Sequence, residues 1–549
     1  MRFREVIGHR LKDALHRCGY VTDDVPLVLE RPRLKEHGDI ATPIALSLAK
    51  VLKKSPMEIA ERVARELDFA QDEVSKIEVA KPGYLNLRVA HDQLLRNVRE
   101  CRVEGDAYGA TDIGKGARCQ IEYVSANPTG PLVVVSARAA AVGSVIVNLL
   151  RSIGFAAEGE YYVNDCGNQV QALGKSLRFR LRERLGHLGA GEEIGAYPGD
   201  YLKAVAARVT ASQAAGWDAD NGTATAGYGD FATEHLLAVI KEDLRLFGVK
   251  FDNFFRESTL HPHTVEEARR IIEDNGHAYS DSGALYFRTT TFGDEKDRVL
   301  VKSDGNPTYF LGDIAYHLDK YRRGYKWVVD ILGPDHHGHI PRMQAASSVL
   351  AGDKNWLKTL IVGWVRLLEG DRPLSMSKRS GEIITMRELI EDVGADVAKY
   401  LFLMRRSNTP LDFDLELARK QSDENPVYYV QYAHARIANV IRFAKTKLQK
   451  KQIESIDLSR LDSPEERDLM VQLLFFPSEV EAAALSFEPH RLTTYARELA
   501  TLFHRFYHEH RIVTDDQEMS NARLYLVEAT KQVLSNVLRL TGVDAPNSM

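Results

Sequence analysis

The sequence of 549 residues has few of the features that mark membrane, secreted or uniformly basic proteins. No apolar run approaches the roughly 18 residues needed to span a bilayer. Residues 1–19 are charged and amphipathic, without the apolar region of a secretion signal. The cysteines form no C-x-x-C pair, which argues against a disulfide framework or a structural zinc site; they are Cys18, Cys101, Cys119 and Cys166. We therefore predict a cytoplasmic protein with reduced thiols.

The net charge of −5 excludes a uniformly basic nucleic-acid binder, but basic side chains gather in two stretches. The first lies within residues 175–184. The second, within residues 436–451, contains no acid and includes Arg436, Arg442, Lys445, Lys447, Lys450 and Lys451. Each stretch is either a solvated helix face or a phosphate-binding surface.

The length and the hydrophobic periodicity predict about three or four domains. Residues 1–110 read as a small α+β domain. Residues 111–390 alternate strands and helices, which predicts a Rossmann-like α/β domain with a parallel sheet and an insertion at about residues 170–300. Residues 391–549 read as helices almost throughout and predict an all-α bundle.

The stretch IEYVSANPTGPLVVVSARAAAVGSVIVNLL, residues 121–150, predicts a strand, a tight turn and a helix of small residues. A helix N-terminus suits a phosphate or carboxylate, although such a turn can also serve packing alone. Ligands of open α/β sheets bind beyond the carboxyl ends of the strands. Glu122, Ser125 and Asn127 follow the strand and could therefore hold a cationic, hydrogen-bonding ligand.

Three later stretches carry further candidate side chains. The polar residues 161–169 follow a strand, where Asn and Asp are equally good turn and helix-capping residues. Tyr309 and Asp313 are four residues apart, so one helix face would present an aromatic ring beside a carboxylate, which suits a guanidinium. The nearby His336, His337 and His339 lack a helical H-x-x-x-H spacing or matching cysteines, so we expect no metal site there.

The last candidate is the Ser-Met-Ser-Lys-Arg-Ser-Gly loop, residues 375–381. Adjacent cations on a loop suit a phosphate chain that gains charge in a transition state. Lys378 and Arg379 supply these cations.

Motifs along nearly the whole chain resemble those of the bacterial-type arginyl-tRNA synthetases, which are class I aminoacyl-tRNA synthetases. The matching segments are EHGDIATPIALSLAK, KPGYLNLRV, EYVSANPTGPL, EYYVNDCGNQ, GDEKDRVLVKSDGNPTYFLGDIAYHLDKYRRG, GPDHHGHIPR, MSKRSG, LDFDLELARKQSDENPVYYVQYAHARI and VLRLTGVDAP. The resemblance implies ATP-dependent attachment of L-arginine to tRNA(Arg) through an arginyl-adenylate, with release of AMP and pyrophosphate. Mg²⁺ is inferred from the ATP chemistry, and we expect a monomer without membrane partners.

The resemblance also implies roles for individual side chains. Arginine binding falls to Glu122, Ser125, Asn127, Tyr309, Asp313, His336 and His337. ATP binding falls to Pro128, Thr129, Gly130, Pro131, Met376, Ser377, Lys378 and Arg379, with Ser377 and Lys378 also catalytic. The first domain is similar to one that contacts the tRNA elbow. The last is similar to an anticodon-binding domain, which favours phosphate contacts for Arg436, Arg442, Lys445 and Lys447.

Two departures from the family pattern affect the expected chemistry. The family's His-x-Gly-His run is here Val133-Val134-Val135-Ser136, and the first lysine of its second signature is Ser375. Either Ser136, Arg138 and the helix N-terminus replace the histidines, or adenylate formation is impaired. The alternative to an active ligase is therefore a synthetase-like tRNA-binding or regulatory paralogue; a metal-dependent hydrolase is a more distant one.

Overall fold

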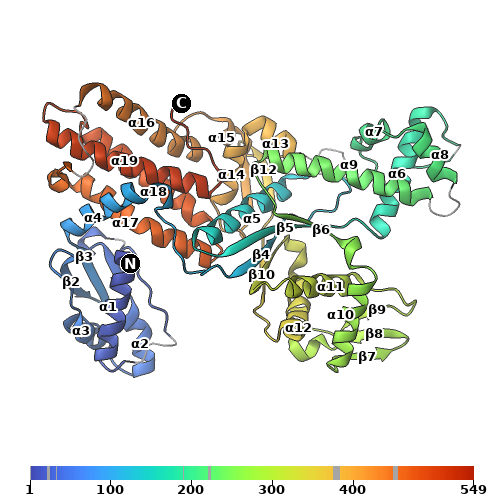
Figure 1. The fold of residues 1–549 in the computed structure, drawn as a ribbon, viewed down its shortest axis with the longest axis horizontal. Coiled ribbons are helices and arrows are strands. Elements are labelled where there is room, and N and C mark those ends of the chain that lie inside the picture. Colours follow the sequence, from blue (N-terminus) through green and yellow to red (C-terminus); the bar gives the residue numbers. More distant parts are fainter. Residues whose placement is uncertain are drawn as a thin grey trace.

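The computed structural model describes residues 2–20, 25–32, 34–189, 191–219, 224–374, 384–448 and 455–549. In Figure 1 the chain runs from a small module (blue) through a central sheet to a bundle of long helices (orange and red). Two further groups of helices and strands (green and yellow-green) extend from the sheet on the side away from the bundle.

The N-terminal module packs helices on a three-stranded antiparallel sheet of order β1-β3-β2. Its apolar side chains recur at helical spacing, as in Ile59 and Val63, and are fully buried. An ion pair of 2.6 Å from Arg467 to Asp39 fastens the module to the bundle. The elements are α1 (Phe3–Arg17), β1 (Ile40–Thr42), α2 (Ile44–Leu52), α3 (Pro56–Glu66), β2 (Val74–Ala80) and β3 (Tyr84–Val89). The next helix, α4 (His91–Glu104), packs on the long helices of the bundle instead.

The central sheet has five strands in the order β11-β10-β4-β5-β6, and every neighbouring pair is parallel. The helix α5 packs on one face with the bundle behind it, whereas α11 and α12 belong to a separate core on the other side. The elements are β4 (Arg118–Glu122), α5 (Val134–Ser152), β5 (Ala156–Val163), β6 (Asn253–Arg256), α11 (Tyr309–Arg322), β10 (Trp327–Leu332), α12 (Ile340–Ala351) and β11 (Leu357–Ile361). The Rossmann-like α/β prediction is confirmed.

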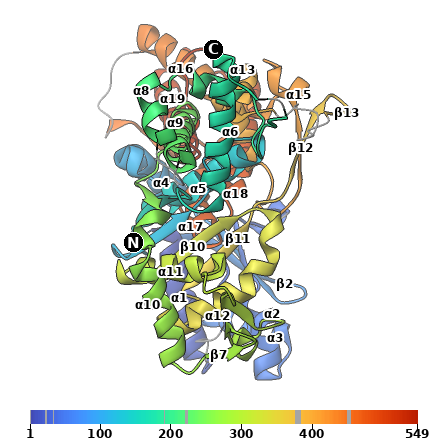
Figure 2. The ribbon, with the colours of Figure 1, turned by 90° about the vertical axis from the view of Figure 1, so that its right-hand side faces the viewer.

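Two excursions leave this sheet, and both views show them on opposite sides of the sheet (Figure 1 and Figure 2). The first, between β5 and β6, comprises α6 (Asn168–Leu185), α7 (Tyr201–Ala206), α8 (Ala211–Ala219) and α9 (Ala224–Leu246). The second, between β6 and α11, comprises η3 (Glu257–Leu260), α10 (His263–Asp274) and the antiparallel strands β7 (Ala278–Asp281), β8 (Ala284–Phe287) and β9 (Arg298–Val301). The basic residues 175–184 therefore lie on α6.

The Gly/Ala-rich stretch at residues 214–229 is mostly helical where the structure describes it. Glycines on both α6 and α9 permit these two helices to pack closely. A Cβ on Gly229 would lie 2.5 Å from the Val170 carbonyl oxygen, and a Cβ on Gly174 would lie 2.1 Å from the Thr225 carbonyl oxygen. Small residues here mark the contact between α6 and α9.

The apolar stretch at residues 360–365 does not form one strand, because the chain passes there from one sheet to another. It leaves β11 at Ile361 and enters β12 (Val365–Glu369), which pairs with β13 (Arg372–Pro373) and β14 (Leu411–Asp414). The remaining elements are helical, as predicted: α13 (Met386–Val393), α14 (Ala395–Leu403), α15 (Leu415–Arg419), α16 (Pro426–Lys447), α17 (Pro464–Leu485), α18 (His490–Glu509) and α19 (Gln517–Leu540).

One helix departs from the expectation that no segment is apolar enough to cross a membrane. By length and composition α5 could do so, but 67% of its most apolar window is buried inside the protein. It packs between the sheet and the helices α14 and α17, which explains its apolar surface by core packing.

Candidate active site

Three acidic side chains form a row across the carboxyl half of the sheet. Strand register places Glu122 of β4 between Asp330 of β10 and Glu160 of β5. Lys320 and Arg323, at the C-terminal end of α11, neutralise the row. The Lys320 ammonium lies 2.7 Å from Glu122 and 2.8 Å from Asp330, and the Arg323 guanidinium donates to both oxygens of Glu160. The buried charges are thus paired, as the low dielectric requires.

The pairing sets the protonation of these acids. Burial alone would raise the pKa of Asp330, but Lys320 and His317 hold it well below its usual range. Burial raises the pKa of Glu122, and Lys320 only partly offsets that effect. The His317 imidazole lies 2.9 Å from Asp330 and 2.8 Å from the Asp313 carbonyl oxygen. These contacts fix the orientation of α11 relative to the sheet.

Asp313 belongs to a second group of acids, at the N-terminal end of α11. Burial raises its pKa to about 7, and the charges of Glu122 and Glu257 contribute. Glu257, the first residue of η3, is 9% exposed, and a Cβ on Gly312 would lie 4.0 Å from its Oε1. Burial raises the pKa of Glu257 as well. We call Glu122, Glu257 and Asp313 the acidic cluster; it favours a cation with several hydrogen-bond donors.

The residues expected to surround Asp313 are only partly brought together. Tyr309 begins α11, one turn before Asp313, with its side chain exposed, so its ring is available to a ligand. His336 and His337 are exposed. The imidazole that approaches Asp313 is His339, at 3.6 Å. Burial and the neighbouring Arg342 lower its pKa to about 3, so the ring is neutral, and its Nδ1 accepts from Arg342 at 2.9 Å.

The loop after β4 is held in an unusual backbone conformation. Val124 and Ser125 have φ values of 68° and 38°, in the left-handed region that side chains with a Cβ rarely adopt. The Ser125 hydroxyl accepts from the Tyr162 backbone at 3.0 Å, and the Tyr161 hydroxyl donates to the Ala126 carbonyl at 2.6 Å. Ser125 therefore shapes the loop, while Asn127 is exposed and available to a ligand.

The remainder of this loop is anchored where it leads into α5. The Tyr201 hydroxyl donates to the Thr129 carbonyl at 2.6 Å. Pro128 is buried, while Thr129, Gly130 and Pro131 are half-buried. The expected ATP-binding turn is thus a constrained loop, held by β5 and α7.

The start of α5 lies directly beside the end of the second signature loop. Val133, the N-cap residue, bridges to Thr385, and the Met386 amide donates to the Leu132 carbonyl at 2.8 Å. Ser136 is half-buried in the first turn. Met376, Ser377, Lys378 and Arg379 lie outside the described residues. The described contacts bring the chain that follows that loop to the α5 N-terminus.

Arg138 does not face this region, contrary to the expectation of a catalytic role. Its side chain is fully buried, and its guanidinium donates to the carbonyls of Gly363, Trp364 and Arg406 at 2.9, 3.4 and 3.1 Å. Burial lowers its pKa to about 10. Arg138 fixes the crossing between β11 and β12, so direct contact with a phosphate is incompatible with this position.

The basic side chains of the second cluster lie on α16. Arg436 stacks on Tyr432 and Tyr507, with its guanidinium carbon 5.4 and 4.4 Å from the ring centres. Phe443, two turns further along the helix, is 54% exposed in the same groove. Arg442, Lys445 and Lys447 are exposed, whereas Lys450 and Lys451 lie outside the described residues. Cations beside accessible rings suit an unpaired nucleic-acid strand.

Comparison with known proteins agrees with this arrangement along the whole chain. The arginyl tRNA synthetase N terminal domain matches residues 5–89, the class I (R) tRNA synthetase catalytic domain matches residues 99–402, and the DALR anticodon binding domain matches residues 430–549. The arginine–tRNA ligase of Moorella thermoacetica is 44% identical over 96% of this chain and 95% of its own. That of Citrifermentans bemidjiense is 42% identical over 96% of each chain.

A solved structure supports the fold. The arginyl-tRNA synthetase of Thermus thermophilus superposes with a TM-score of 0.79 over 100% of both chains, at 21% sequence identity. A parallel sheet with its catalytic-domain match, followed by an anticodon-binding bundle, defines a class I aminoacyl-tRNA synthetase. Within that class the chain belongs to the arginyl-tRNA synthetase family, whose members are ligases that join arginine to tRNA with ATP as substrate. The comparisons give no support to the binding-only alternative.

Several side chains of the site were missed by sequence reasoning. Asp330 and Glu160 flank Glu122 only through strand register, and Lys320 reaches it from α11. Glu257 reaches the acidic cluster only because β6 lies two strands from β4. His339 was weighed only as a metal ligand. Alternating strands and helices do not reveal which charges meet, so the sequence offered no signal for Glu257.

Proposed function

We propose that this protein ligates L-arginine to tRNA(Arg) in two steps at the carboxyl end of β4. The arginine carboxylate attacks the α-phosphate of ATP, which releases pyrophosphate and leaves arginyl-adenylate. A ribose hydroxyl at the tRNA terminus then attacks the carbonyl carbon, and AMP leaves. The acidic cluster carries this proposal, because it offers a guanidinium-binding group. The chain that leaves Glu122 at the end of β4 leads directly into the N-terminus of α5, which suits a phosphate.

We assign the contacts with the arginine guanidinium to the N-terminal half of α11 and to η3. Asp313 and Glu257 neutralise the cation and accept its hydrogen bonds, while the exposed ring of Tyr309 stacks against it. Two carboxylates around one guanidinium exclude shorter or neutral amino acids, because those would leave Glu257 and Asp313 without a cationic partner. We assign His339 as a positioning residue, since its neutral ring approaches the Asp313 carboxylate.

We assign binding of the α-amino group of arginine to the end of β4 and the loop that follows it. Lys320 takes Oε2 of Glu122, and we assign the other oxygen, together with Asn127, to the substrate ammonium. Ser125 contributes by holding the loop. The ammonium therefore completes the charge balance around Glu122, whose pKa burial raises.

We assign ATP binding to three parts of the chain. They are the first turn of α5, the loop of Pro128, Thr129, Gly130 and Pro131, and the signature residues Met376, Ser377, Lys378 and Arg379. The amides of the α5 N-terminus suit the phosphates, and Lys378 and Ser377 are assigned to charge developing on the α-phosphate. Two acids of the described sheet row, Glu160 and Asp330, are engaged by Arg323 and Lys320. Mg²⁺ would be held mainly by the ATP phosphates and water, and it would neutralise charge on the phosphates.

The missing histidines should slow the first step without removing it. One hydrogen-bond donor to a developing oxyanion is worth about 3–4 kcal/mol. Here the backbone amides of the α5 first turn and the Ser136 hydroxyl are the groups left to supply that stabilisation.

The groove on α16 is proposed to hold the anticodon loop. Unpaired bases stack on Phe443 and Tyr432 while Arg436, Arg442, Lys445 and Lys447 contact phosphates. The N-terminal module is assigned to the tRNA elbow. We further propose a cytoplasmic monomer.

Charging of tRNA(Arg) with radiolabelled arginine tests these assignments. Asp313→Ala should abolish charging, whereas Tyr309→Phe should retain most of it, because the ring that stacks is kept. Lys378→Ala should slow adenylate formation more than it weakens tRNA binding. Unchanged charging by Asp313→Ala would refute the guanidinium assignment, and equal losses of both properties in Lys378→Ala would refute the phosphate assignment.

A further inference from the structure

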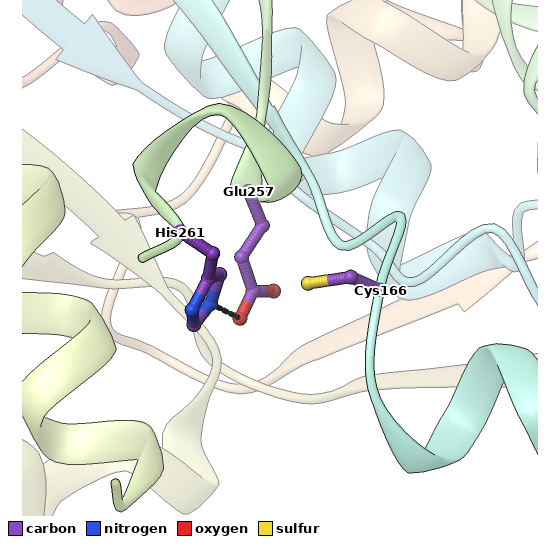
Figure 3. A group of neighbouring side chains, drawn as sticks. All are labelled: Cys166, Glu257 and His261. Carbon is purple, nitrogen blue, oxygen red and sulfur yellow. Dashed lines mark ion pairs between the residues drawn. The ribbon is translucent and has the colours of Figure 1, made fainter. Parts of the chain in front are cut away.

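Three metal-binding side chains meet beside the acidic cluster. Cys166 follows β5, Glu257 opens η3 and His261 follows η3, and Figure 3 shows their side chains converging from two segments of the chain. One ligand atom from each lies within 4.8 Å of the other two, and the His261 Nε2 atom is 3.8 Å from the Glu257 Oε1 atom. Among the described residues this is the only such group of three, and the ligation chemistry uses neither Cys166 nor His261.

The ligand set fits zinc better than magnesium or calcium. A thiolate and an imidazole are borderline-soft ligands that select Zn²⁺, and three protein ligands with a fourth open position are a common zinc arrangement. Tetrahedral bonds of about 2.0–2.3 Å place ligand atoms about 3.5 Å apart, so the present atoms need to approach by about 1 Å. The His261 side chain is 39% exposed and can turn towards the metal.

The groups around these three side chains affect both the binding of a cation and the protonation of the Cys166 thiol. Asp165, next to Cys166 in the chain, adds a negative charge nearby, although Arg256 contacts its carboxylate at 3.3 Å and Ser258 donates to both of its oxygens. Burial, with the charges of Glu257 and Asp165, raises the pKa of the Cys166 thiol to about 12. The thiol is therefore protonated at neutral pH, and metal binding must release its proton to solvent.

We propose that Cys166, Glu257 and His261 bind one Zn²⁺ ion, and that this ion competes with substrate arginine because both need the Glu257 carboxylate. The competition rests on the proposed guanidinium contact of Glu257; the metal site itself does not. A divalent cation on Glu257 also repels a guanidinium at Asp313, so the two ligands exclude each other. Zinc would then act as a reversible inhibitor of arginine activation.

Cobalt binding to the purified full-length protein tests the site directly. Co²⁺ alone should produce a thiolate-to-cobalt charge-transfer band in the wild type. Cys166→Ala should remove the band, and His261→Ala should weaken binding by at least about tenfold. His263→Ala is the matched control, since His263 is an exposed histidine two residues away, and it should behave like the wild type. Absence of the band, or the same band in Cys166→Ala, would overturn the site.

Arginine titrations without ATP test the competition. At a free Zn²⁺ concentration tenfold above its dissociation constant, the apparent Kd for arginine should rise about elevenfold in the wild type. It should not change in Cys166→Ala. A cobalt band together with an arginine Kd insensitive to zinc would overturn the competition. Separately, Glu257→Gln titrated with arginine in EDTA tests the guanidinium contact, since unchanged affinity there would refute that contact while leaving the cobalt result to decide the metal site.

Discussion

Arginine binding should weaken about tenfold when the pH falls from 8 to 6, because Asp313 takes up a proton. Its pKa in the unliganded protein is about 7, raised mainly by burial. The guanidinium stays charged throughout and pairs with the ionised carboxylate. The apparent Kd therefore scales as one plus the ratio of protonated to ionised Asp313, which is about 0.1 at pH 8 and about 10 at pH 6. Since the side chain is 37% exposed, screening makes this an upper value.

The direction of this pH dependence follows from the protonation state of Asp313 that binds arginine. Below pH 7 the carboxyl group is largely neutral in the free protein, so the bound cation must displace a proton. Isothermal titration calorimetry without ATP, in two buffers of different ionisation enthalpy, should count nearly one proton released per arginine at pH 6 and close to none at pH 8. His339, with a pKa of about 3, does not titrate in this range.

Two variants separate Asp313 from the other acids of the cluster. Asp313→Asn should bind arginine weakly with little pH dependence between 6 and 8, whereas Tyr309→Phe should keep the full dependence. A Kd that stays constant in the wild type, or an identical slope in Asp313→Asn, would refute the assignment of this proton to Asp313.

Three further outcomes are expected. Restoring the signature with V133H, V135G and S136H should raise arginine-dependent pyrophosphate exchange at least about 100-fold, since each oxyanion donor is worth about 10²–10³; an unchanged rate would mean that the α5 amides already suffice. Lys320→Met should lower the free energy of unfolding in urea by about 3–5 kcal/mol, because Glu122 and Asp330 lose their buried partner; unaltered stability would contradict that pairing. R442A, K445A and K447A together should lower the salt dependence of tRNA binding by about 2–3 in log–log slope, while the exposed Lys354→Ala should not; equal slopes would exclude these phosphate contacts.

Local patterns in the sequence were sufficient for the elements and for half of the arginine-binding group. Tyr309 and Asp313 share a helix face by spacing alone, and the strand, turn and helix at residues 121–150 follow from apolar runs and prolines. The rest depends on pairings distant in sequence. Lys320 and Glu122, which are 198 residues apart, meet only because β10, which follows α11, pairs with β4.

For Arg138 the sequence indicated a role that its position in the fold does not support. Its position in register with the family signature indicated catalysis, but a side chain on α5 can face either the ligand or the interior. Here Arg138 faces the interior, where three carbonyls satisfy its guanidinium. Single-sequence periodicity cannot distinguish these two faces on a helix whose surface is apolar almost throughout.

Arginine-dependent exchange of pyrophosphate into ATP, measured with cognate tRNA present, tests the central claim most directly. The site described here predicts exchange that requires arginine, is lost in Asp313→Ala and rises when the histidine signature is restored. Tight tRNA binding with neither exchange nor charging, in both the wild type and the restored variant, would contradict an active arginine–tRNA ligase.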